Sequence, residues 1–126
     1  MVTAESLQPE WRRTPASAEY FTKERCHILE LSNTADDPHV SVARARVEPG
    51  ISTAAHRVHG TVERYVVLQG EGIATVEGMA PVRVQVGDVV VIPAGASQFV
   101  HNTGAEDLIF LCVCTPRFEW DNYEAV

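Results

Sequence analysis

Two stretches of the chain, residues 50–70 and 87–102, hold the polar side chains best suited to chemistry. They are His56, His59, Glu63 and Tyr65 in the first stretch and Gln98 in the second. An imidazole, a carboxylate and an amide oxygen suit a divalent transition metal such as Zn, Mn, Fe or Ni. Three protein ligands plus water leave open coordination positions, as in catalytic metal sites. These residue types therefore predict a metal or acid–base site for a small molecule.

Alternation along β-strands predicts which of these side chains share a cavity, because successive side chains point to opposite faces. If Glu63 faces inward, Tyr65 does too, and an inward His56 leaves Arg57 outside. The same parity places Gln98 inside, against a wall of valine and alanine side chains. A concave, mostly apolar pocket with a few convergent polar groups is the usual form of a small-molecule site.

Several of these residues also have purely structural interpretations. His59 lies in the loop 59–62, where strict alternation does not hold, so it is either an edge ligand or a surface histidine. Tyr65 is either a proton donor or an aromatic wall residue, and Gln98 is either a ligand or an amide that closes the pocket floor. Glu63 in an apolar barrel is costly without a partner, so it requires one of these polar groups or a cation.

The elements that must hold these side chains are short strands separated by turns. Apolar segments alternate with Gly, Pro and Asn turn signals, which predicts about nine strands and an all-β barrel. Besides the strand around His56, the segments are 26–31, 40–47, 63–68, 73–76, 82–86, 88–92, 98–101 and 108–114.

The barrel is expected to be flanked by two other segments. Residues 1–22 are interpreted as an N-terminal arm or edge element, residues 23–116 as the barrel and residues 117–126 as a C-terminal tail. The tail is aromatic, and it is expected either to cover the barrel mouth or to pack on a partner subunit. Its aromatic residues are Phe118, Trp120 and Tyr123.

The two stretches resemble the two halves of the cupin signature, G-x5-H-x-H-x3/4-E-x6-G and G-x5-P-x-G-x2-H-x3-N. The residues that match these patterns are Gly50, His56, Glu63 and Gly70, and then Gly87, Pro93, Gly95 and Asn102. Two usual metal ligands of the family are replaced, the second histidine by Val58 and the histidine of the second half by Gln98.

The resemblance covers roughly residues 40–115 and implies a double-stranded β-helix, or jelly-roll barrel. It also implies a divalent transition metal held by His56, Glu63 and Gln98, with His59 at the edge. Small proteins of this family usually pair, so a homodimer is expected. The matching glycines and Pro93 are interpreted as turn and corner residues rather than catalytic ones.

Composition excludes several other classes of function. The formal net charge is −7 and the pI is about 5.1. No run of Lys or Arg forms a basic stripe, which argues against nucleic acid and anionic membrane surfaces as partners. The longest apolar run, residues 108–114, is too short to span a bilayer. Three cysteines and a polar N-terminus predict reduced thiols and a cytoplasmic location.

Three functions are compatible with this pattern. The first is an enzyme acting on a small oxygen-rich metabolite, as an isomerase, decarboxylase or dioxygenase, with Glu63 or Tyr65 moving a proton. It is expected to use a metal, although a metal-free version has His56 as the base and Glu63 as its orienting partner. The second is a non-catalytic module that binds or senses a small ligand with a degenerate metal site. The third is a purely structural oligomer.

Overall fold

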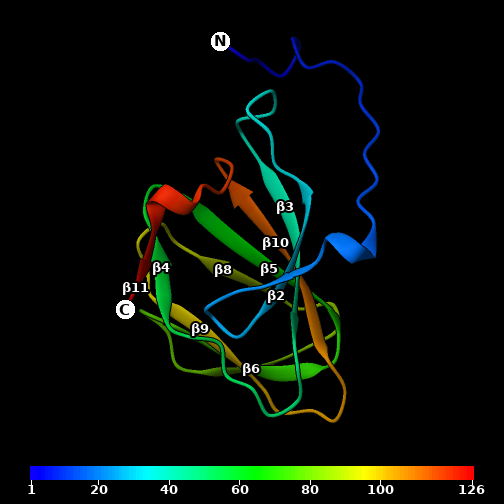
Figure 1. Cartoon of the computed structure of the whole chain (residues 1–126). Coiled ribbons are helices and arrows are strands. Elements are labelled where there is room, and N and C mark those ends of the chain that lie inside the picture. The colour runs from blue at the N-terminus through cyan, green and yellow to red at the C-terminus, as the bar shows by residue number, and fades with distance from the viewer.

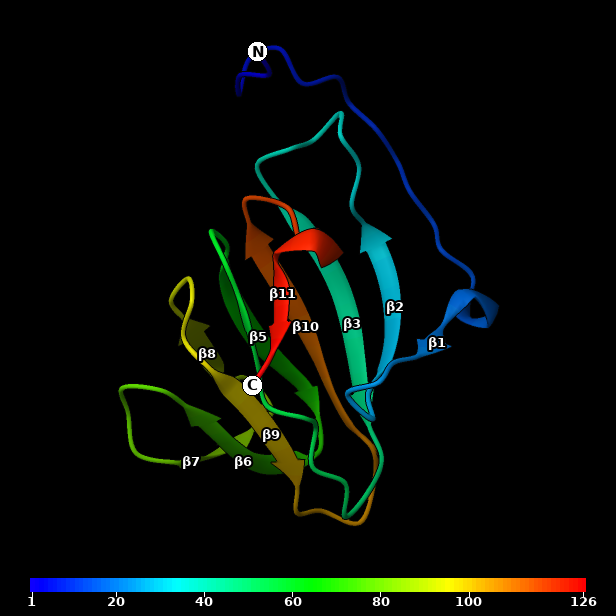
Figure 2. The ribbon, with the colours of Figure 1, turned by 60° about the vertical axis from the view of Figure 1, so that its left-hand side comes forward.

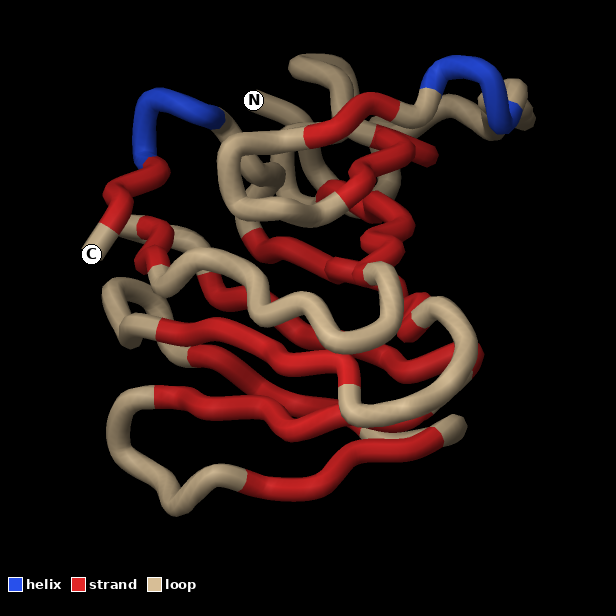
Figure 3. The backbone as a smooth tube through the Cα atoms, turned by 60° about the horizontal axis from the view of Figure 1, so that its bottom comes forward, coloured by secondary structure: helices blue, strands red, loops and turns tan.

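The computed structural model describes all residues from 1 to 126 and is built almost entirely of strands (Figure 1). The strands are β1 (Tyr20–Phe21), β2 (His27–Ser32), β3 (Ser41–Val47), β4 (His56–Val58), β5 (Val62–Gln69), β6 (Glu71–Val76), β7 (Val82–Gln85), β8 (Val89–Ile92), β9 (Gln98–Asn102), β10 (Leu108–Thr115) and β11 (Tyr123–Ala125). The helical elements are two single turns of 3-10 helix, η1 (Ala16–Ala18) and η2 (Trp120–Asn122), drawn in blue in Figure 3.

The strands form two antiparallel sheets that face each other across an apolar core. One sheet has the order β1-β2-β3-β10-β5-β8 and the other β11-β4-β9-β6-β7. Strands that are distant in sequence are paired, as in β3 with β10 and β6 with β9, so the chain winds back and forth between the layers. The all-β jelly-roll barrel expected from the sequence is therefore confirmed.

Buried and exposed residues alternate along the strands, and the packing of the buried side chains holds the two sheets together. In β5 the buried side chains are Glu63, Tyr65 and Val67, while β8 buries Val90 and Ile92. The buried residues of both sheets meet in a single apolar cluster that includes Val47, Leu108 and Phe110. Because the period is two, the polar residues of β5 and β9 at inward positions must enter the barrel with the valines.

The chain has eleven strands rather than the expected nine. The additional strands are β1, with two residues, and β11, with three. Neither is long enough to show an alternating pattern, and both are fixed by pairing with distant partners, β2 and β4 respectively. Figure 2 shows β11 in red, leading to the C-terminus. The C-terminal tail is thus part of the smaller sheet.

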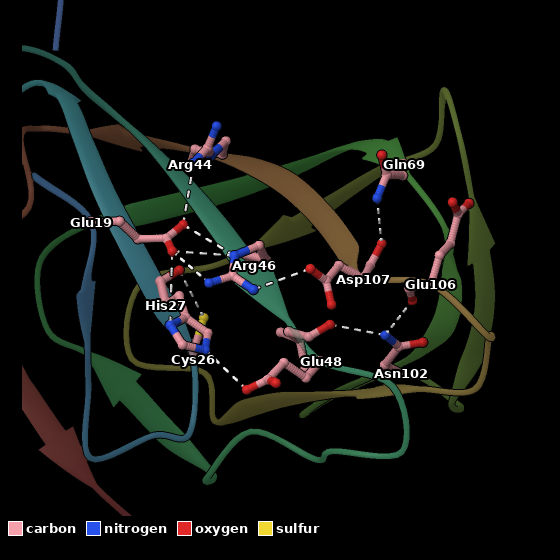
Figure 4. Close-up of polar contacts among 11 residues, drawn as sticks. Glu19, Cys26, His27, Arg44, Arg46, Glu48, Gln69, Asn102, Glu106 and Asp107 are labelled. Carbon is pink, nitrogen blue, oxygen red and sulfur yellow. Dashed lines mark hydrogen bonds and ion pairs between the residues drawn. The ribbon is translucent and has the colours of Figure 1, made fainter. Parts of the chain in front are cut away.

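An ionic network on the outer face of the larger sheet anchors the N-terminal segment. The Glu19 carboxylate accepts a hydrogen bond from Arg46 Nη2 at 2.6 Å and is 3.2 Å from Arg44 Nη2 (Figure 4). Arg46 also donates to Asp107 at 3.1 Å. The hydrogen bond from Arg46 keeps the pKa of Glu19 below its usual value, against the opposing effect of burial. Because Glu19 directly precedes β1, this network fixes where the β1–β2 hairpin lies.

Close backbone packing at one corner of the barrel requires glycine. A Cβ atom at Gly72 would lie 2.5 Å from the carbonyl oxygen of His101 and 2.9 Å from a methyl carbon of Leu108. At Gly70, where φ is +82°, a Cβ would lie 2.8 Å from the carbonyl oxygen of Asp107. No side chain fits at such separations, so these glycines set how closely β6 approaches the β9–β10 connection.

Asn102 links three segments at the same corner. Its fully buried side chain donates from Nδ2 to the carbonyls of Val47 and Glu106, each at 2.9 Å, and Oδ1 accepts from the amide of Gly104 at 2.8 Å. Two of these contacts are visible in Figure 4. The asparagine of the second sequence stretch is therefore structural, since each polar atom of its amide has a backbone partner.

Replacing Asn102 by Ala should lower the free energy of unfolding by about 3 kcal/mol, because buried backbone groups lose their partners. Urea denaturation monitored by circular dichroism measures this change. Thr103→Ala, at the exposed neighbouring position, is the matched control and should change stability little. Equal stability of the two variants would contradict the structural role of Asn102.

Candidate functional site

A cavity of about 60 Å³ lies inside the barrel between the larger sheet and strands β4 and β9. Twelve of its eighteen lining residues are hydrophobic. The ionisable lining residues include Glu24, Glu30, His56 and Glu63. No lysine or arginine lines the cavity. An apolar cavity with a few polar groups is the expected form of a small-molecule site.

Three of the five predicted site residues line this cavity, and a fourth, Gln98, is hydrogen-bonded to two of them. His56 of β4 lies directly opposite Gln98 of β9 in the sheet, and both are buried. Glu63 and Tyr65 enter from β5 in the other sheet and are also buried. His56, Glu63 and Tyr65 line the cavity itself, while Gln98 is enclosed behind them. These four side chains therefore lie on the inward faces that strand alternation predicts.

A chain of hydrogen bonds fixes three of these side chains. The Tyr65 hydroxyl donates to the Gln98 amide oxygen, and the Gln98 amide nitrogen donates to Glu63 Oε1. The second Glu63 oxygen, Oε2, lies 3.8 Å from the Cys114 thiol. Both the oxygen and the nitrogen of the Gln98 amide thus have partners inside the protein, and Gln98 links Tyr65 to Glu63.

His59 lies outside the cavity. Its side chain is 57% exposed, and its Nε2 is 3.3 Å from a carboxylate oxygen of Glu124 in β11. The turn after β4 carries it to the surface, where the main-chain amide of His59 is bound by the carbonyl of Asn122. The structure therefore does not bring His59 together with the other candidate residues.

The partner of His56 is Glu24, which the sequence analysis did not identify. His56 Nδ1 lies 2.6 Å from Glu24 Oε2 and 3.1 Å from the carbonyl oxygen of Ala54. With two acceptors at Nδ1, the ring carries its proton there, and Nε2 keeps its lone pair in the neutral form. Glu24 precedes both sequence stretches and belongs to no motif, so nothing in the local sequence distinguishes it from a surface glutamate.

The tight turn between β1 and β2 positions Glu24. Thr22 accepts from the amide of Glu24 at 3.2 Å, and Arg25 adopts a left-handed conformation with φ of 65°. The turn is bound to the segment before β4, because the amide of Ala54 donates to the Glu24 carbonyl at 3.0 Å and Arg25 Nε donates to the carbonyl of Ser52 at 2.9 Å. Glu24 and His56 are therefore held by the same pair of segments.

Burial and charge shift the pKa values of this group in a consistent pattern. Burial alone would lower the pKa of His56, but the hydrogen bond and charge of Glu24, with help from Ala54 and Glu63, raise it above 6.5. Burial raises the pKa of Glu63, although His56 and Gln98 oppose that change. The pKa of Tyr65 is raised well above 10, mainly by burial and then by the charge of Glu63. Tyr65 is therefore a neutral hydrogen-bond donor.

The aromatic tail closes one side of this site. Tyr123 stacks on the His56 ring with centroids 5.1 Å apart, and Trp120 lies 5.1 Å from Tyr123. Phe118 and Trp120 both line the cavity. Of the two alternatives for the tail, the structure shows that it covers the cavity within the same chain.

Residues 43–114, more than half of the chain, match the family described as "Cupin domain". The match contains both sequence stretches and the strands from β4 to β9 that carry His56, Glu63 and Gln98. The chain belongs to the cupin family. No helix in this cupin is long and apolar enough to cross a membrane.

Comparison with individual proteins supports the same assignment. An oxalate-binding protein from Thermotoga maritima is 39% identical over 71 residues, a match that spans 56% of this cupin and 58% of that protein. The crystal structure of a "predicted oxalate decarboxylase" from Thermotoga maritima has 29% identity and a TM-score of 0.66, covering 92% of this chain and 98% of that one. The Streptomyces nucleoside dehydratase Pac13 shares the fold, with 16% identity and a TM-score of 0.75 over 94% of this chain and 92% of that one.

The predicted metal ligands of this cupin are not arranged to bind a divalent metal. No three side chains among its His, Cys, Asp and Glu residues are close enough to share an ion. Val58 supplies no donor at the position of the second family histidine, and the Gln98 oxygen already accepts from Tyr65. The carboxylate nearest the imidazole, Glu24, is on its Nδ1 side. No catalytic step is therefore assigned to a metal.

Replacing Glu24 by Gln should lower the pKa of His56, because the variant removes the charge that favours the imidazolium. A pH titration of the His56 ring by NMR measures the shift. Since the raised pKa of His56 contributes stability below pH 6.5 that is lost as pH rises through the folded value, the stability cost of the variant should be largest below that pH. Glu124→Gln, beside the exposed His59, is the control. An unchanged His56 titration in the Glu24 variant would contradict the pairing.

Proposed function

We propose that this cupin is an enzyme that moves protons on a small oxygen-rich metabolite without requiring a metal. The observation that supports this most directly is the pairing of the buried His56 with the largely buried Glu24, with Nδ1 and Oε2 2.6 Å apart, beside the Glu63 carboxyl in one cavity. A base whose second nitrogen is oriented by a carboxylate is a recurring catalytic arrangement. The metal-free version predicted from the sequence had Glu63 as the orienting partner of His56, but the carboxylate at Nδ1 is that of Glu24, which leaves Glu63 available as an acid.

In this mechanism His56 is the general base. Glu24 and the Ala54 carbonyl hold the Nδ1 proton, so Nε2 is the atom that accepts a proton from the substrate. The charge of Glu24 stabilises the imidazolium that then forms. The raised pKa of His56 makes its neutral imidazole a stronger base toward the substrate proton.

Glu63 is the complementary acid. Its burial raises its pKa, which favours the protonated carboxyl that can donate to a substrate oxygen. Gln98 holds Oε1 of Glu63, and Tyr65 holds Gln98, so both are positioning residues in this scheme. Two titratable groups in different environments of one cavity are typical of a general acid and a general base.

The reaction class that follows is isomerisation or elimination next to a carbonyl. His56 removes a proton from the carbon beside the carbonyl, and the electron pair of that C–H bond forms a carbon–carbon double bond. Glu63 donates its proton to the carbonyl oxygen, giving an enol, or to a departing hydroxyl group, which leaves as water. Return of the protons to other positions completes an isomerisation, and no oxidant or reductant is needed.

A second candidate function is binding of a small ligand without turnover. The oxalate-binding relative favours it. The charges of the cavity disfavour oxalate itself, because Glu24, Glu30 and Glu63 line it and no lysine or arginine does. A dianion would meet like charges at short range unless a cation accompanied it. If the ligand is bound without turnover, His56 still changes its protonation with pH but removes no proton from the ligand.

His56→Asn should slow substrate proton exchange by about 10²- to 10⁴-fold, the usual contribution of a general base. Incorporation of deuterium from D₂O into a panel of small keto and hydroxy compounds, followed by NMR, measures this rate. His59→Asn is the matched control and should retain full activity, because its side chain lies at the surface. Equal rates for the two variants would contradict the role of His56.

Metal analysis of the same preparations distinguishes the metal-free mechanism from the metal site predicted for His56, Glu63, Gln98 and His59. The protein is first purified without a chelator. It is expected to keep its proton-exchange activity after exhaustive treatment with a chelator. A stoichiometric transition metal, lost together with the activity, would overturn the metal-free mechanism and support a metal-dependent enzyme.

We also propose that the protein forms a homodimer through the outer face of β10, β5 and β8. Leu111, Val66 and Val89 lie side by side across these strands and point away from the core. Val89 and Val91 are more than half exposed, and Leu68 is 47% exposed. Apolar side chains gathered in this way on the outer face of a single subunit favour pairing with its own copy around a two-fold axis.

Sedimentation should therefore give a dimer at micromolar concentration. Replacing both Val89 and Val91 by Lys should convert it to a monomer, because symmetry places the new charges on both subunits of the interface. Val82→Lys, at an exposed position in the other sheet, is the control. A monomeric native protein, or a dimer that the double variant leaves intact, would contradict this interface.

The three cysteines support a reducing location such as the cytoplasm. All three are free thiols in the fold. Cys112 and Cys114 point into the cavity from neighbouring inward positions of β10. Burial raises the pKa of Cys114 to about 12, so this thiol is not a nucleophile at neutral pH.

A further inference from the structure

The mouth of the cavity combines carboxylates with aromatic rings. Tyr20, Phe118 and Trp120 line it together with Glu24 and Glu30. Tyr20 and Trp120 are also 39% and 47% exposed, so both reach from the cavity to solvent. The proton transfer described above uses Glu24 but leaves Glu30 and the three rings without a role.

Glu30 carries an unused hydrogen-bond acceptor. Its Oε2 is buried and has no hydrogen-bond partner, although the residue lines the cavity from β2. Burial raises the pKa of this carboxyl, against a smaller lowering by Asn33. Buried polar atoms almost always have a partner, so an orphaned carboxylate oxygen on a residue that lines the cavity indicates a donor supplied from outside the chain.

The aromatic rings beside it are held rigidly. The backbone amide of Phe118 donates to Ser41 Oγ at 2.9 Å, and its carbonyl accepts from Asn33 Nδ2 at 2.8 Å. The Phe118 and Trp120 rings then meet edge to face, with centroids 5.0 Å apart. Fixed aromatic faces next to carboxylates attract cations through the ring quadrupole as well as through charge.

We propose that the ligand of this cavity is a small protonated amine, with its ammonium group between the Glu30 carboxylate and the rings of Trp120 and Tyr20. Its N–H bonds satisfy Glu30 Oε2, and the rest of the molecule extends toward His56. A protonated amine would thus be the substrate class of the proposed enzyme. The amine proposal rests on that function only where it places the reacting carbon near His56. A cavity of about 60 Å³ restricts the enclosed part to a few non-hydrogen atoms.

Binding of simple probes tests this directly. In a Trp11→Phe background Trp120 is the sole tryptophan, because Trp11 is the other one and is 76% exposed. Propylammonium, 1-propanol, propionate and tetramethylammonium are titrated while Trp120 fluorescence and the heat of binding are recorded. Propylammonium is expected to saturate the site and to bind about tenfold or more tightly than 1-propanol, which has the same shape but no charge. Tetramethylammonium, which has no N–H, is expected to bind more weakly than propylammonium, and propionate not at all.

Two variants locate the site, and a third separates this proposal from the catalytic one. Glu30→Gln and Trp120→Leu should each weaken propylammonium binding about tenfold. Glu48→Gln, a carboxylate on the outer face beside His27, should leave it unchanged. His56→Asn removes the proposed base but keeps Glu30 and Trp120, so it should still bind the amine.

The outcomes are distinct. If the native protein shows no proton exchange while both it and the His56 variant bind propylammonium, the catalytic function is overturned and the ligand class is supported. Propylammonium binding that equals 1-propanol binding, that is absent, or that survives Glu30→Gln and Trp120→Leu would overturn the amine proposal while leaving the catalytic one standing.

Discussion

The free-energy cost of burying a charge without a partner governs the polar side chains around His56 and Glu63. Strand alternation carries Glu63 into an apolar core, and a carboxylate cannot remain there unsupported. The protein supports it with Gln98, which is in turn held by Tyr65, and with the charge of His56. His56 itself is supported by Glu24. The result is a linked set of polar side chains reaching from the β1–β2 turn to β5 and β9.

This linkage makes distant parts of the fold interdependent. The ionic network around Glu19 fixes the start of β1, the turn that follows carries Glu24, and the same turn is hydrogen-bonded to the segment before β4. On the opposite side, Tyr123 of β11 stacks on the imidazole. Segments from both ends of the chain, outside the residues matched by the family, therefore complete the environment of His56.

The departures from the family pattern have a physical consequence. The chain has valine at position 58 and glutamine at position 98, where the family pattern has histidines. Gln98 has become a rigid amide link inside the wall, and the imidazole that remains is paired with a carboxylate rather than with other imidazoles. The ionisable residues that line the cavity are His56 together with carboxylates such as Glu24, Glu30 and Glu63, and no lysine or arginine balances their charge.

The sequence by itself determined the barrel, the faces of its strands and the convergence of His56, Glu63, Tyr65 and Gln98. Each of these depends on a period of two and on glycine and proline corners, which are local properties of the chain. Only the tertiary structure decided the partners. Glu24 reaches His56 across a sequence separation of 32 residues because a hairpin folds back over the barrel, and no local pattern encodes that approach.

The same distinction explains the remaining differences. His59 obeys the sequence spacing of the family but lies beyond the end of β4, where the turn directs it to solvent and to Glu124. Strands β1 and β11 are too short to have a period and exist only through pairing with β2 and β4. The sequence was compatible with two placements of the aromatic tail, over the barrel mouth or on a partner subunit. Its position over the cavity was decided by the hydrogen bonds that Ser41 and Asn33 make to the backbone of Phe118.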